Sequence, residues 1–535
     1  MKVTPPYEKP YNSLFFKLLY AVSKPVAVQP VFSLLLYVLF FLLDVFFDGG
    51  FPTLTPLQKI IHGIFITYIL LLPTLFLPRY VRGVYKFVVI VVAAIQFLVD
   101  VYLAILYGET FSTLHVDMVA AIGGTNSAEA KEYLASYLTA DKIFIITLAI
   151  SLLSLCFCYL NRLKIKFSPL SRWVVSVVVL ASVAVSLLQW RVVLLGNIYF
   201  LLRTDNEDLT EYRQNPVVVC DGNSPEYVVL LVGESFAKQQ SSLYGYNKET
   251  NPLLGKMNEE GRLAVYKNVT SACTKTVPAF KSIMSSYVDG ESAGKWYEYL
   301  TLIEVMQRAG YSTAWLSNQN REGLFDNEVT AFALLCDELV FANERGLTSY
   351  DECLLRLIDE SLLAGTSSKF FIVNMQGSHV VYSSRYSEDF AKFSAEDYVV
   401  SHPHLSQKSR ITLSEYDNSV LYNDSVVYEI MQKFKEKDAV VVYLPDHGQD
   451  IFNSSDDYAG HGVFANEKSQ AAAVNIPLMI YTSPLFREKR PALQERIDAA
   501  VDVAFRSDSI MYTIMDVAGI ESVNNVSYKQ KSLVK

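Results

Sequence analysis

The chain has 535 residues, a formal net charge of −9 and 51% hydrophobic residues. This length predicts at least two domains, and the acidic balance without a basic stripe argues against nucleic acid as a partner. The hydrophobic residues are unevenly distributed. Long apolar runs dominate the chain up to about Val193, whereas from about Pro216 onward the composition is that of a soluble, mixed α/β protein.

Five apolar stretches in the first part are long enough to cross a bilayer, which takes about 20 residues. They are 28–47, 58–78, 84–106, 142–160 and 172–194. One such stretch alone is also compatible with a buried core helix, but five in succession favour a transmembrane domain. The first stretch is unlike a signal peptide, because it begins late and no small-residue cleavage site follows it.

Lysine and arginine gather in alternate loops of this part, and such loops face the cytoplasm. They lie before residue 25, at 79–86 and at 162–172, whereas the 108–141 loop is poor in them. Five spans then place everything after Leu194 outside the inner membrane, in the periplasm. We expect a transmembrane domain at 1–194 with an N-terminal interfacial helix, a connector at 195–225 and a periplasmic catalytic domain at 226–535.

From residue 226 the pattern alternates short β-branched runs with helical periodicity, which is typical of a doubly wound, largely parallel sheet. The expected strands are 227–233, 263–269, 312–317, 370–375, 439–444 and 475–481. The expected helices are 252–260, 278–287, 297–309, 351–364 and 411–435. The segment 383–410, rich in Ser, His and Lys, is expected to be an exposed excursion. We therefore predict an α/β domain beside an α-helical membrane domain.

Two of the expected strands end in residues that bind metals. Glu234 follows the strand 227–233, and the pair Asp446-His447 follows the strand 439–444. Open α/β sheets place their ligands at the carboxyl ends of parallel strands. Carboxylate oxygen combined with imidazole nitrogen suits Zn²⁺ or Mn²⁺, so these side chains are predicted to meet at one metal ion. His379 and His461, which lie in glycine-flanked segments, are expected to join them.

A candidate nucleophile precedes the expected helix at 278–287. Pro278 fits the first turn of a helix, which places Thr276 near the N-cap, in the positive end of the helix dipole. A threonine there is often only a cap. A nearby metal ion would lower the pKa of its hydroxyl and make it a nucleophile. Thr274 and Cys273 remain alternatives.

At this point the chain resembles the bacterial phosphoethanolamine transferases of the alkaline-phosphatase/sulfatase superfamily. The resemblance rests on motifs that run in order along nearly the whole chain. They are the five spans, Gly123-Gly124-Thr125-Asn126 with Glu129 and Glu132, Gly233-Glu234-Ser235, Tyr244-Gly245-Tyr246 with Thr250-Asn251-Pro252, Thr274-Lys275-Thr276, Ser317-Asn318-Gln319 with Asp326-Asn327, Gly377-Ser378-His379 with Arg385-Tyr386, Tyr416-Asp417-Asn418-Ser419, Asp446-His447-Gly448 and Gly460-His461-Gly462.

The resemblance implies a role for each site residue. It implies one tightly bound zinc ion, with Mn²⁺ less favoured, and a second zinc ion left open. It implies Thr276 as the residue that carries phosphoethanolamine, although counting from the proline as in lipid A enzymes selects Cys273. The implied zinc ligands are Glu234, Thr276, Asp446 and His447, with His379 and His461 on the phosphoryl group or a second zinc. Lys275 and Asn418 are our own candidates for contact with the phosphate or the ethanolamine head; the alternative is that they are helix-surface residues.

The resemblance also implies the partners. The donor would be phosphatidylethanolamine, and the acceptor lipid A or another envelope glycan; we expect a monomer among membrane lipids. A phosphoglycerol transferase that uses phosphatidylglycerol, and a non-catalytic envelope protein with a relic site, are the alternatives. The cysteine pairs that flank the nucleophile in many lipid A enzymes are absent. The four cysteines of the second part, Cys220, Cys273, Cys336 and Cys353, allow three pairings or free thiols.

Overall fold

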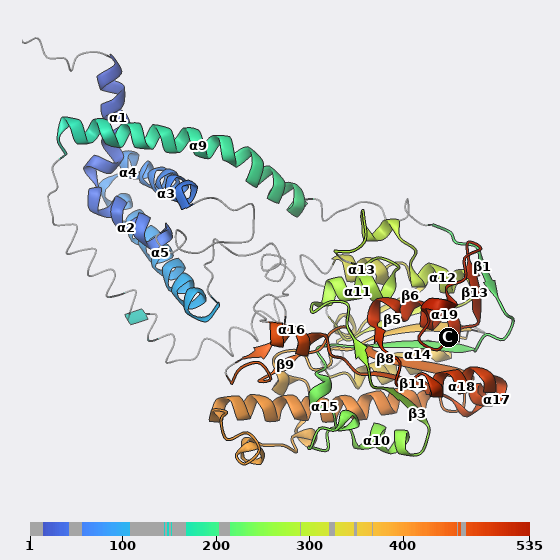
Figure 1. Ribbon diagram of the computed structural model, residues 1–535. Helices are drawn as coiled ribbons and strands as arrows, with labels where there is room; N and C mark the ends of the chain where they lie inside the picture. The colour runs from blue at the N-terminus through green and yellow to red at the C-terminus, as the bar shows by residue number, and fades with distance from the viewer. Residues whose placement is uncertain are drawn as a thin grey trace, which may run out of the picture. The chain divides into compact units, whose positions relative to one another are not determined.

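The computed structural model (Figure 1) describes residues 14–41, 56–107, 167–202 and 214–535, together with a few positions between 144 and 151. Within these ranges it does not describe residues 289, 320–326, 347–349, 366–367, 457 and 462–466. The described residues fall into two compact units. One consists of the helices up to residue 202, and the other begins at residue 214. Each is described below by itself.

The N-terminal unit is helical. Its helices are α1 (Leu14–Val28), α2 (Pro30–Phe41), α3 (Pro56–Leu71), α4 (Pro73–Phe76), α5 (Arg79–Tyr107) and α9 (Pro169–Leu202). A small core of Phe32, Leu36, Leu71 and Ile90 holds α2, α3 and α5 together. Many other apolar side chains of this unit are exposed, among them Phe76 and Phe87, as expected for helices that face lipid.

The five expected spans are only partly seen. Two described helices are long and apolar enough to cross a membrane, Arg79–Leu98 and Pro169–Ser186. A third is obtained if the pair Lys17–Val28 and Pro30–Leu39, bent by 72°, counts as one span. Proline explains the breaks, because it lacks the N–H that continues a helix: the expected span 28–47 is interrupted before Pro30, and 58–78 before Pro73.

Two further expectations concern the ends of this unit. The expected span 142–160 and the motif at 123–132 lie outside the described residues, apart from isolated positions. The helix α9 extends to Leu202, so the first part of the predicted connector 195–225 is helical and continues the last span. The apolar run that begins the helix ends at Leu194, but Asn197 and Tyr199 are compatible with helix, and periodicity alone did not reveal the extension.

The C-terminal unit is built on one seven-stranded sheet in the order β3-β11-β8-β2-β7-β5-β6. The strands β8, β2, β7, β5 and β6 are parallel, whereas β11 is antiparallel to both β3 and β8. The sheet is therefore mixed, and the prediction of a largely parallel sheet holds only for the five-stranded block. The strand bounds are β2 Tyr227–Gly233, β3 Leu263–Tyr266, β5 Ser312–Ser317, β6 Glu338–Phe341, β7 Lys369–Asn374, β8 Ala439–Pro445 and β11 Leu478–Thr482.

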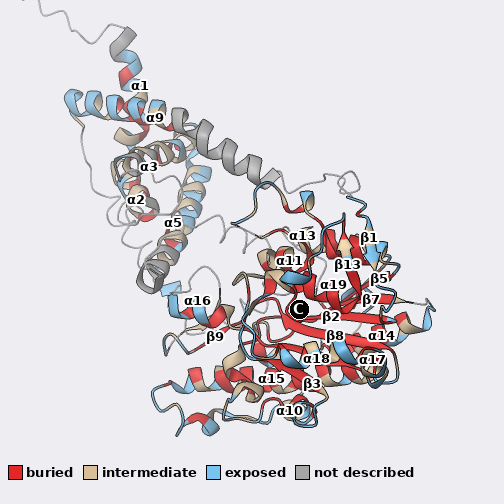
Figure 2. Ribbon diagram, turned by 45° about the vertical axis from the view of Figure 1, so that its right-hand side comes forward, coloured by how far each residue is buried: buried red, intermediate tan, exposed pale blue. Residues whose placement is uncertain are grey.

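Helices cover both faces of this sheet, which leaves its strands buried (Figure 2). Alternate side chains of β2 enter different cores: Val228 and Leu230 pack on one face, Val229 and Leu231 on the other. The first face is covered by α11 (Thr276–Met284), α12 (Leu302–Arg308), α13 (Asn327–Ala333), α17 (Pro484–Lys489), α18 (Pro491–Ala499) and α19 (Ile510–Val517). The second is covered by α10 (Pro252–Glu259), α14 (Cys353–Leu363) and the 27-residue α15 (Gln407–Lys433).

Shorter elements complete the unit. Three two-stranded ribbons pair β1 (Val218–Cys220) with β13 (Ile520–Val523), β4 (Val269–Thr270) with β12 (Phe505–Arg506), and β9 (Asp450–Ile451) with β10 (Ala459–Gly460); α16 (Glu467–Val474) follows the last. The segment 383–410 is largely exposed, as expected, but its 3₁₀ turns pack against α15 and Tyr398 is fully buried. Among the described cysteines, Cys220, Cys336 and Cys353 are free thiols.

Candidate metal centre and nucleophile

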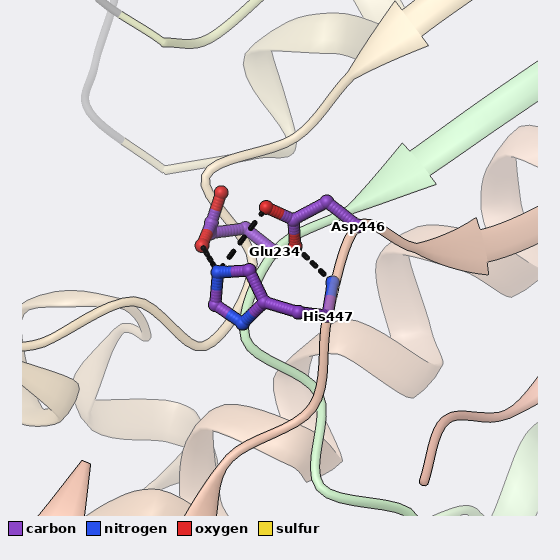
Figure 3. A group of neighbouring side chains, drawn as sticks. All are labelled: Glu234, Asp446 and His447. Carbon is purple, nitrogen blue, oxygen red and sulfur yellow. Dashed lines mark hydrogen bonds and ion pairs between the residues drawn. The ribbon is translucent and has the colours of Figure 1, made fainter. Parts of the chain in front are cut away.

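The carboxyl ends of β2 and β8 bring three potential metal ligands together. The two strands are parallel neighbours in which Gly233 is level with Pro445, so Glu234 and Asp446 leave the sheet side by side. The Nε2 atom of His447 lies 3.2 Å from Oε1 of Glu234 and 3.3 Å from Oδ2 of Asp446 (Figure 3). All three side chains are buried. The sequence-predicted ligands therefore converge on one point.

The chemistry of this triad fits a metal cation. The Nδ1 atom of His447 donates a hydrogen bond to the carbonyl of Gly448 at 2.8 Å, so Nε2 is the ring nitrogen directed at the two carboxylates. The Oδ2 atom of Asp446 is buried and has no hydrogen-bond partner. Converging electron-pair donors repel each other unless a proton or a cation lies among them. Imidazole nitrogen and carboxylate oxygen are both ligands that zinc accepts in proteins.

The pKa values of these three side chains reflect the same repulsion between converging electron-pair donors. Burial acts to lower the pKa of His447, but the charges of Asp446 and Glu234 outweigh it and raise that pKa to about 9. Burial and the charge of Glu234 raise the pKa of Asp446 well above its usual range. Burial also opposes ionisation of Glu234, yet its hydrogen bond to His447 leaves its pKa below the ordinary value. A divalent cation at this point would take the place of protons among these groups.

Backbone geometry fixes Glu234 in place. The next residue, Ser235, has a left-handed conformation with φ of 55°, which turns the chain sharply at the end of β2. Its hydroxyl donates to Oε1 of Glu234 at 2.9 Å, and its N–H to Oδ1 of Asp446 at 3.3 Å. The hydroxyl of Tyr416, from α15, donates to the Ser235 carbonyl at 2.7 Å and accepts from the N–H of Ala237. The turn is therefore locked from both sides.

Thr276 places its hydroxyl against the triad. It is the first residue of α11, after the N-cap Lys275, and Pro278 lies in the first turn as predicted. The Oγ1 atom lies 3.3 Å from Nε2 of His447 and 3.4 Å from each carboxylate oxygen of Glu234. Among the described residues, no comparable contact involves Thr274. Of the two threonines, the structure brings Thr276 to the metal ligands.

The segment before Thr276 is pinned to the ligand-bearing strand. The Ser271 hydroxyl donates to the Asp446 carbonyl at 2.6 Å and accepts from the N–H of Cys273 at 3.3 Å. The Ser271 N–H donates to the carbonyl of Val474 at 2.7 Å. These bonds fix the path of the chain between β4 and α11, and with it the position of the nucleophile.

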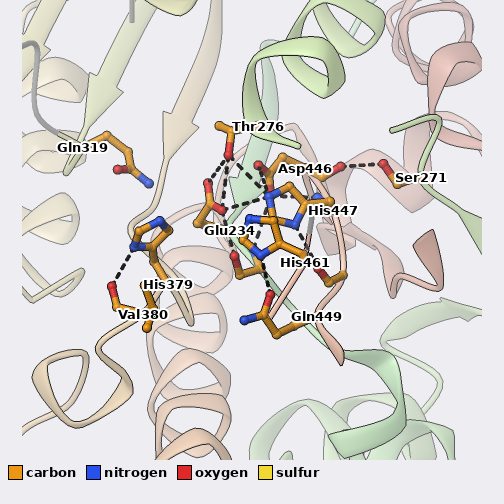
Figure 4. A network of polar contacts seen from close by, with 12 residues as sticks. Glu234, Ser271, Thr276, Gln319, His379, Val380, Asp446, His447, Gln449 and His461 are labelled. Carbon is orange, nitrogen blue, oxygen red and sulfur yellow. Dashed lines mark hydrogen bonds and ion pairs between the residues drawn. The ribbon is translucent and has the colours of Figure 1, made fainter. Parts of the chain in front are cut away.

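Two more histidines and a lysine surround the triad, as Figure 4 shows for the histidines. The ring of His461 lies 4.0 Å from that of His447, centroid to centroid. Burial, then the nearby positive charges of His447, His379 and Lys275, hold the pKa of His461 well below its usual range, although Glu234 acts in the opposite direction. Nδ1 of His379 bonds the carbonyl of Val380 at 2.8 Å. The structure thus gathers His379, His461 and Lys275 around Thr276.

Asn418 differs from expectation. It is buried in α15, and its amide oxygen accepts from the N–H groups of Lys392 and Phe393 at 2.9 and 2.8 Å. Its amide nitrogen donates to the carbonyl of Phe393 at 2.9 Å. Both ends of the amide hold the 390–393 loop, so the structure gives Asn418 a role in loop packing instead of the expected contact with substrate.

Several residues around the site were given no role from the sequence, although Tyr416 and Gln319 belong to the motifs quoted above. Ser271 and Tyr416 act through backbone groups that only the fold brings into reach. Gln319, two residues after β5, donates a hydrogen bond from Nε2 to the Met375 carbonyl at 3.0 Å. Figure 4 draws it together with Thr276 and His379. Gln449 directly follows the motif Asp446-His447-Gly448, but its contact with His461 has no local sequence signal.

A family model for sulfatases matches residues 226–520, more than half of the chain. The chain belongs to the sulfatase family. Among curated relatives, the phosphoethanolamine transferase EptC of Escherichia coli O18:K1:H7 (strain RS218 / NMEC) is 26% identical over 546 residues, covering 93% of this chain and 92% of the relative. The phosphoethanolamine transferase EptA of Helicobacter pylori is 28% identical but covers 53% of each chain. The resemblance to the bacterial phosphoethanolamine transferases is confirmed.

Solved sulfatase-family structures agree with the fold. The C-terminal periplasmic domain of EptC from Escherichia coli, crystallised in complex with Zn, is 26% identical, covers 60% of this chain and 90% of that one, and has a TM-score of 0.54. The integral membrane transferase EptA from Neisseria meningitidis, 20% identical, covers 97% of this chain and 98% of that one with a TM-score of 0.59. The second match shows that the fold is shared over both units.

Proposed function

We propose that the protein is an inner-membrane phosphotransferase that moves phosphoethanolamine from phosphatidylethanolamine to a cell-envelope acceptor, lipid A or a lipopolysaccharide glycan. One observation carries the proposal: the Thr276 hydroxyl lies within 3.4 Å of Glu234 and His447, at the edge of a buried metal-ligand cluster. The EptC relative, matched over 93% of this chain, supports the choice of the transferred group.

Glu234, Asp446, His447 and the Thr276 hydroxyl would hold one zinc ion. Zinc bound there supplies a positive charge that lowers the pKa of the hydroxyl and attracts phosphate oxygens. The chain's own residues set the geometry. Thr276 stands at the N-terminus of α11, where backbone N–H groups and the helix dipole favour an incoming phosphate. Lys275 adds a positive charge beside it.

The reaction proceeds in two displacements. In the first, Oγ1 of Thr276 loses its proton and attacks the phosphorus of the donor; a P–O bond forms to Thr276, the P–O bond to diacylglycerol breaks, and diacylglycerol leaves with a proton. In the second, a hydroxyl or phosphate oxygen of the acceptor attacks the phospho-threonine and restores the Thr276 hydroxyl. His379 and His461 lie where they would bind the phosphoryl oxygens or a second zinc ion.

The apolar N-terminal unit fits a lipid donor. Its long helices and exposed apolar side chains suit a multi-pass anchor, from which the C-terminal unit would work in the periplasm on lipid of the outer leaflet. No step of the proposed mechanism requires a second copy of the chain, which is consistent with a monomer.

The decisive experiment is the intact mass of the full-length protein after incubation with phosphatidylethanolamine vesicles. We expect wild type and Thr274→Ala to gain the mass of one phosphoethanolamine, and Thr276→Ala to gain none. A gain in Thr276→Ala would move the nucleophile to another residue. A glycerol-phosphate adduct from phosphatidylglycerol vesicles, with none from phosphatidylethanolamine, would replace the proposal by a phosphoglycerol transferase. Mass spectrometry of lipid A from expressing cells then identifies the acceptor.

A further inference from the structure

The three histidines around Thr276 make the same kind of contact through Nδ1. Each presents its Nδ1 atom to an oxygen: the Gly448 carbonyl for His447, the Val380 carbonyl for His379, and the amide oxygen of Gln449 for His461. A neutral imidazole with a hydrogen on Nδ1 keeps a lone pair on Nε2, and the two nitrogens point in divergent directions. An acceptor at Nδ1 therefore determines what Nε2 can bind.

His461 differs from the other two in the source of this acceptor. For His447 and His379 it is the carbonyl of the following residue, which no substitution removes. For His461 it is Oε1 of Gln449, 12 positions earlier in the chain and 2.5 Å from Nδ1. The ribbon of β9 and β10 explains the contact: Ile451 is level with Ala459 and Asp450 with Gly460, so Gln449 and His461 are next in register.

Gln449 is itself held from the opposite side. Its side chain is buried, and Nε2 donates to the hydroxyl of Tyr382 at 2.6 Å. The ring of Tyr382 packs edge-on against that of Tyr416 at 4.9 Å between centroids. Tyr416 is the residue that locks the Ser235 turn next to Glu234. With its NH₂ group directed to Tyr382, the amide turns its oxygen toward His461.

The contact with Gln449 also determines which nitrogen of His461 faces the site. In Figure 4 the Gln449 amide lies on the side of His461 away from Thr276, so Nε2 is the nitrogen available to the site.

We infer that Gln449 is a positioning residue for the transfer reaction: its amide oxygen holds His461 in the form with hydrogen on Nδ1 and leaves Nε2 as an electron-pair donor beside Thr276. In this form His461 accepts the proton of an attacking acceptor hydroxyl or binds a cation. Of the two roles proposed for His461 above, this form selects the second zinc ion, because Nε2 then has no hydrogen to donate to a phosphoryl oxygen. The kinetic consequence rests on the proposed function, but the state of the ring does not.

Two substitutions separate the hydrogen bond from packing. Gln449→Met has similar length and no acceptor, whereas Gln449→Glu keeps an oxygen that accepts from Nδ1. The full-length protein, labelled with ¹⁵N-histidine, is studied by ¹⁵N NMR, with the His461 signals identified by their loss in His461→Ala. We expect hydrogen on Nδ1 in wild type and Gln449→Glu, and loss of that pattern in Gln449→Met. Hydrogen on Nε2 of His461 in wild type would overturn the inference.

Turnover with phosphatidylethanolamine vesicles gives the second readout. Because residues that orient a ligand typically contribute 10- to 100-fold, we expect Gln449→Met to lose about tenfold or more, and Gln449→Glu to stay within about threefold of wild type. Zinc content should be unchanged in both, since neither substitution touches the triad. Equal losses of turnover in Gln449→Met and Gln449→Glu would show that the neutral amide is required, and not merely an oxygen that accepts from Nδ1. That result would contradict the inference.

A third variant, which leaves Gln449 itself unchanged, tests the inference in case the Gln449 variants do not fold. Tyr382→Phe leaves Gln449 intact but removes the group that orients its amide, so the His461 pattern should become mixed and turnover should fall by less than in Gln449→Met. If the ¹⁵N pattern of His461 is unchanged in Gln449→Met and in Tyr382→Phe, the positioning role of Gln449 is refuted. If wild type forms no covalent adduct, the proposed function fails, while the NMR comparison still tests Gln449.

Discussion

The hydroxyl of Ser271 donates a hydrogen bond to the backbone carbonyl of Asp446. Ser271 lies five positions before Thr276, and Asp446 directly follows β8 with its side chain in the candidate metal centre. This one bond therefore joins the segment that carries Thr276 to the residues after β8 that form the candidate metal centre. The distance between Thr276 and His447 depends on it, although neither residue takes part in the bond.

We predict that Ser271→Ala lowers turnover while zinc content is retained. A buried hydrogen bond contributes about 1 kcal/mol net, and its loss leaves the Asp446 carbonyl without this donor. Because placement of a reacting group strongly affects rate, we expect a fall of about tenfold in adduct formation by Thr276, measured by intact mass against time. Ser271→Thr keeps the hydroxyl and serves as the control. Wild-type rates in Ser271→Ala would show that the helix α11 alone positions Thr276.

We predict that Asp446→Asn abolishes tight zinc binding. A neutral amide is a poor zinc ligand, and the substitution removes one of the two charges that attract the ion. Zinc per chain is measured by atomic emission after dialysis against a mild chelator. Asp502→Asn, at an exposed aspartate paired with Lys267, is the matched control and should keep wild-type zinc. Zinc retained by Asp446→Asn would remove this residue from the ligand set.

We predict that Gly377→Ala disrupts the site more than its backbone conformation alone explains. Gly377 has φ of 55°, and a Cβ there would lie 2.6 Å from the carbonyl oxygen of Glu234. Gly346, with φ of 65° and nothing within 4 Å of a Cβ, is the matched control. An L-residue in this conformation costs about 1–2 kcal/mol at either position. Only Gly377→Ala should also lose zinc, since Glu234 must move; equal effects on zinc would contradict this account.

We predict a pH-dependent stabilisation by Asp417→Asn. Burial raises the pKa of Asp417 to about 7, although the hydroxyls of Tyr246 and Tyr398 donate to its carboxylate. Between about pH 4 and pH 7 the folded protein thus binds a proton that the unfolded chain releases. The stability of wild type therefore falls as pH rises through this window and is level above it.

Asparagine cannot ionise, so the variant lacks this loss. Relative to wild type, Asp417→Asn should gain roughly 3 kcal/mol of stability between pH 5 and pH 8, because about two pKa units of the shift lie within this pH range. Thermal unfolding of the full-length protein in detergent at both pH values measures the difference. A difference that does not change with pH would mean that Asp417 is ionised in the folded protein at pH 5.

The sequence allowed the ligand triad to be predicted because the information is local and the topology simple. The runs before Glu234 and Asp446 are continuous and β-branched, which favours buried parallel strands, and the ends of neighbouring parallel strands meet. Thr276 was placed within one residue of its position by Pro278. The resemblance to the phosphoethanolamine transferases added roles, and the comparison with relatives confirmed the branch.

The rest depends on information that a run of residues does not contain. The apolar residues Leu478–Thr482 predict a strand but not its direction, so the antiparallel β11 was missed. The strand β6 has four residues and begins with Glu338, which resembles a loop. The contact between Gln449 and His461 follows from the register of a short ribbon. In the N-terminal unit, hydropathy did not locate the breaks at Pro30 and Pro73.

The adjacency of β2 and β8 also sets when the protein can acquire its metal. Ser235 and Asp446 are hydrogen-bonded although 211 positions separate them in the chain. During synthesis, a chain that has emerged only as far as β7 contains Glu234 and Thr276 but neither Asp446 nor His447. With the proposed ligand set, zinc would be held by all of its ligands only when β2 and β8 lie side by side, so complete zinc loading would report that these long-range contacts have formed.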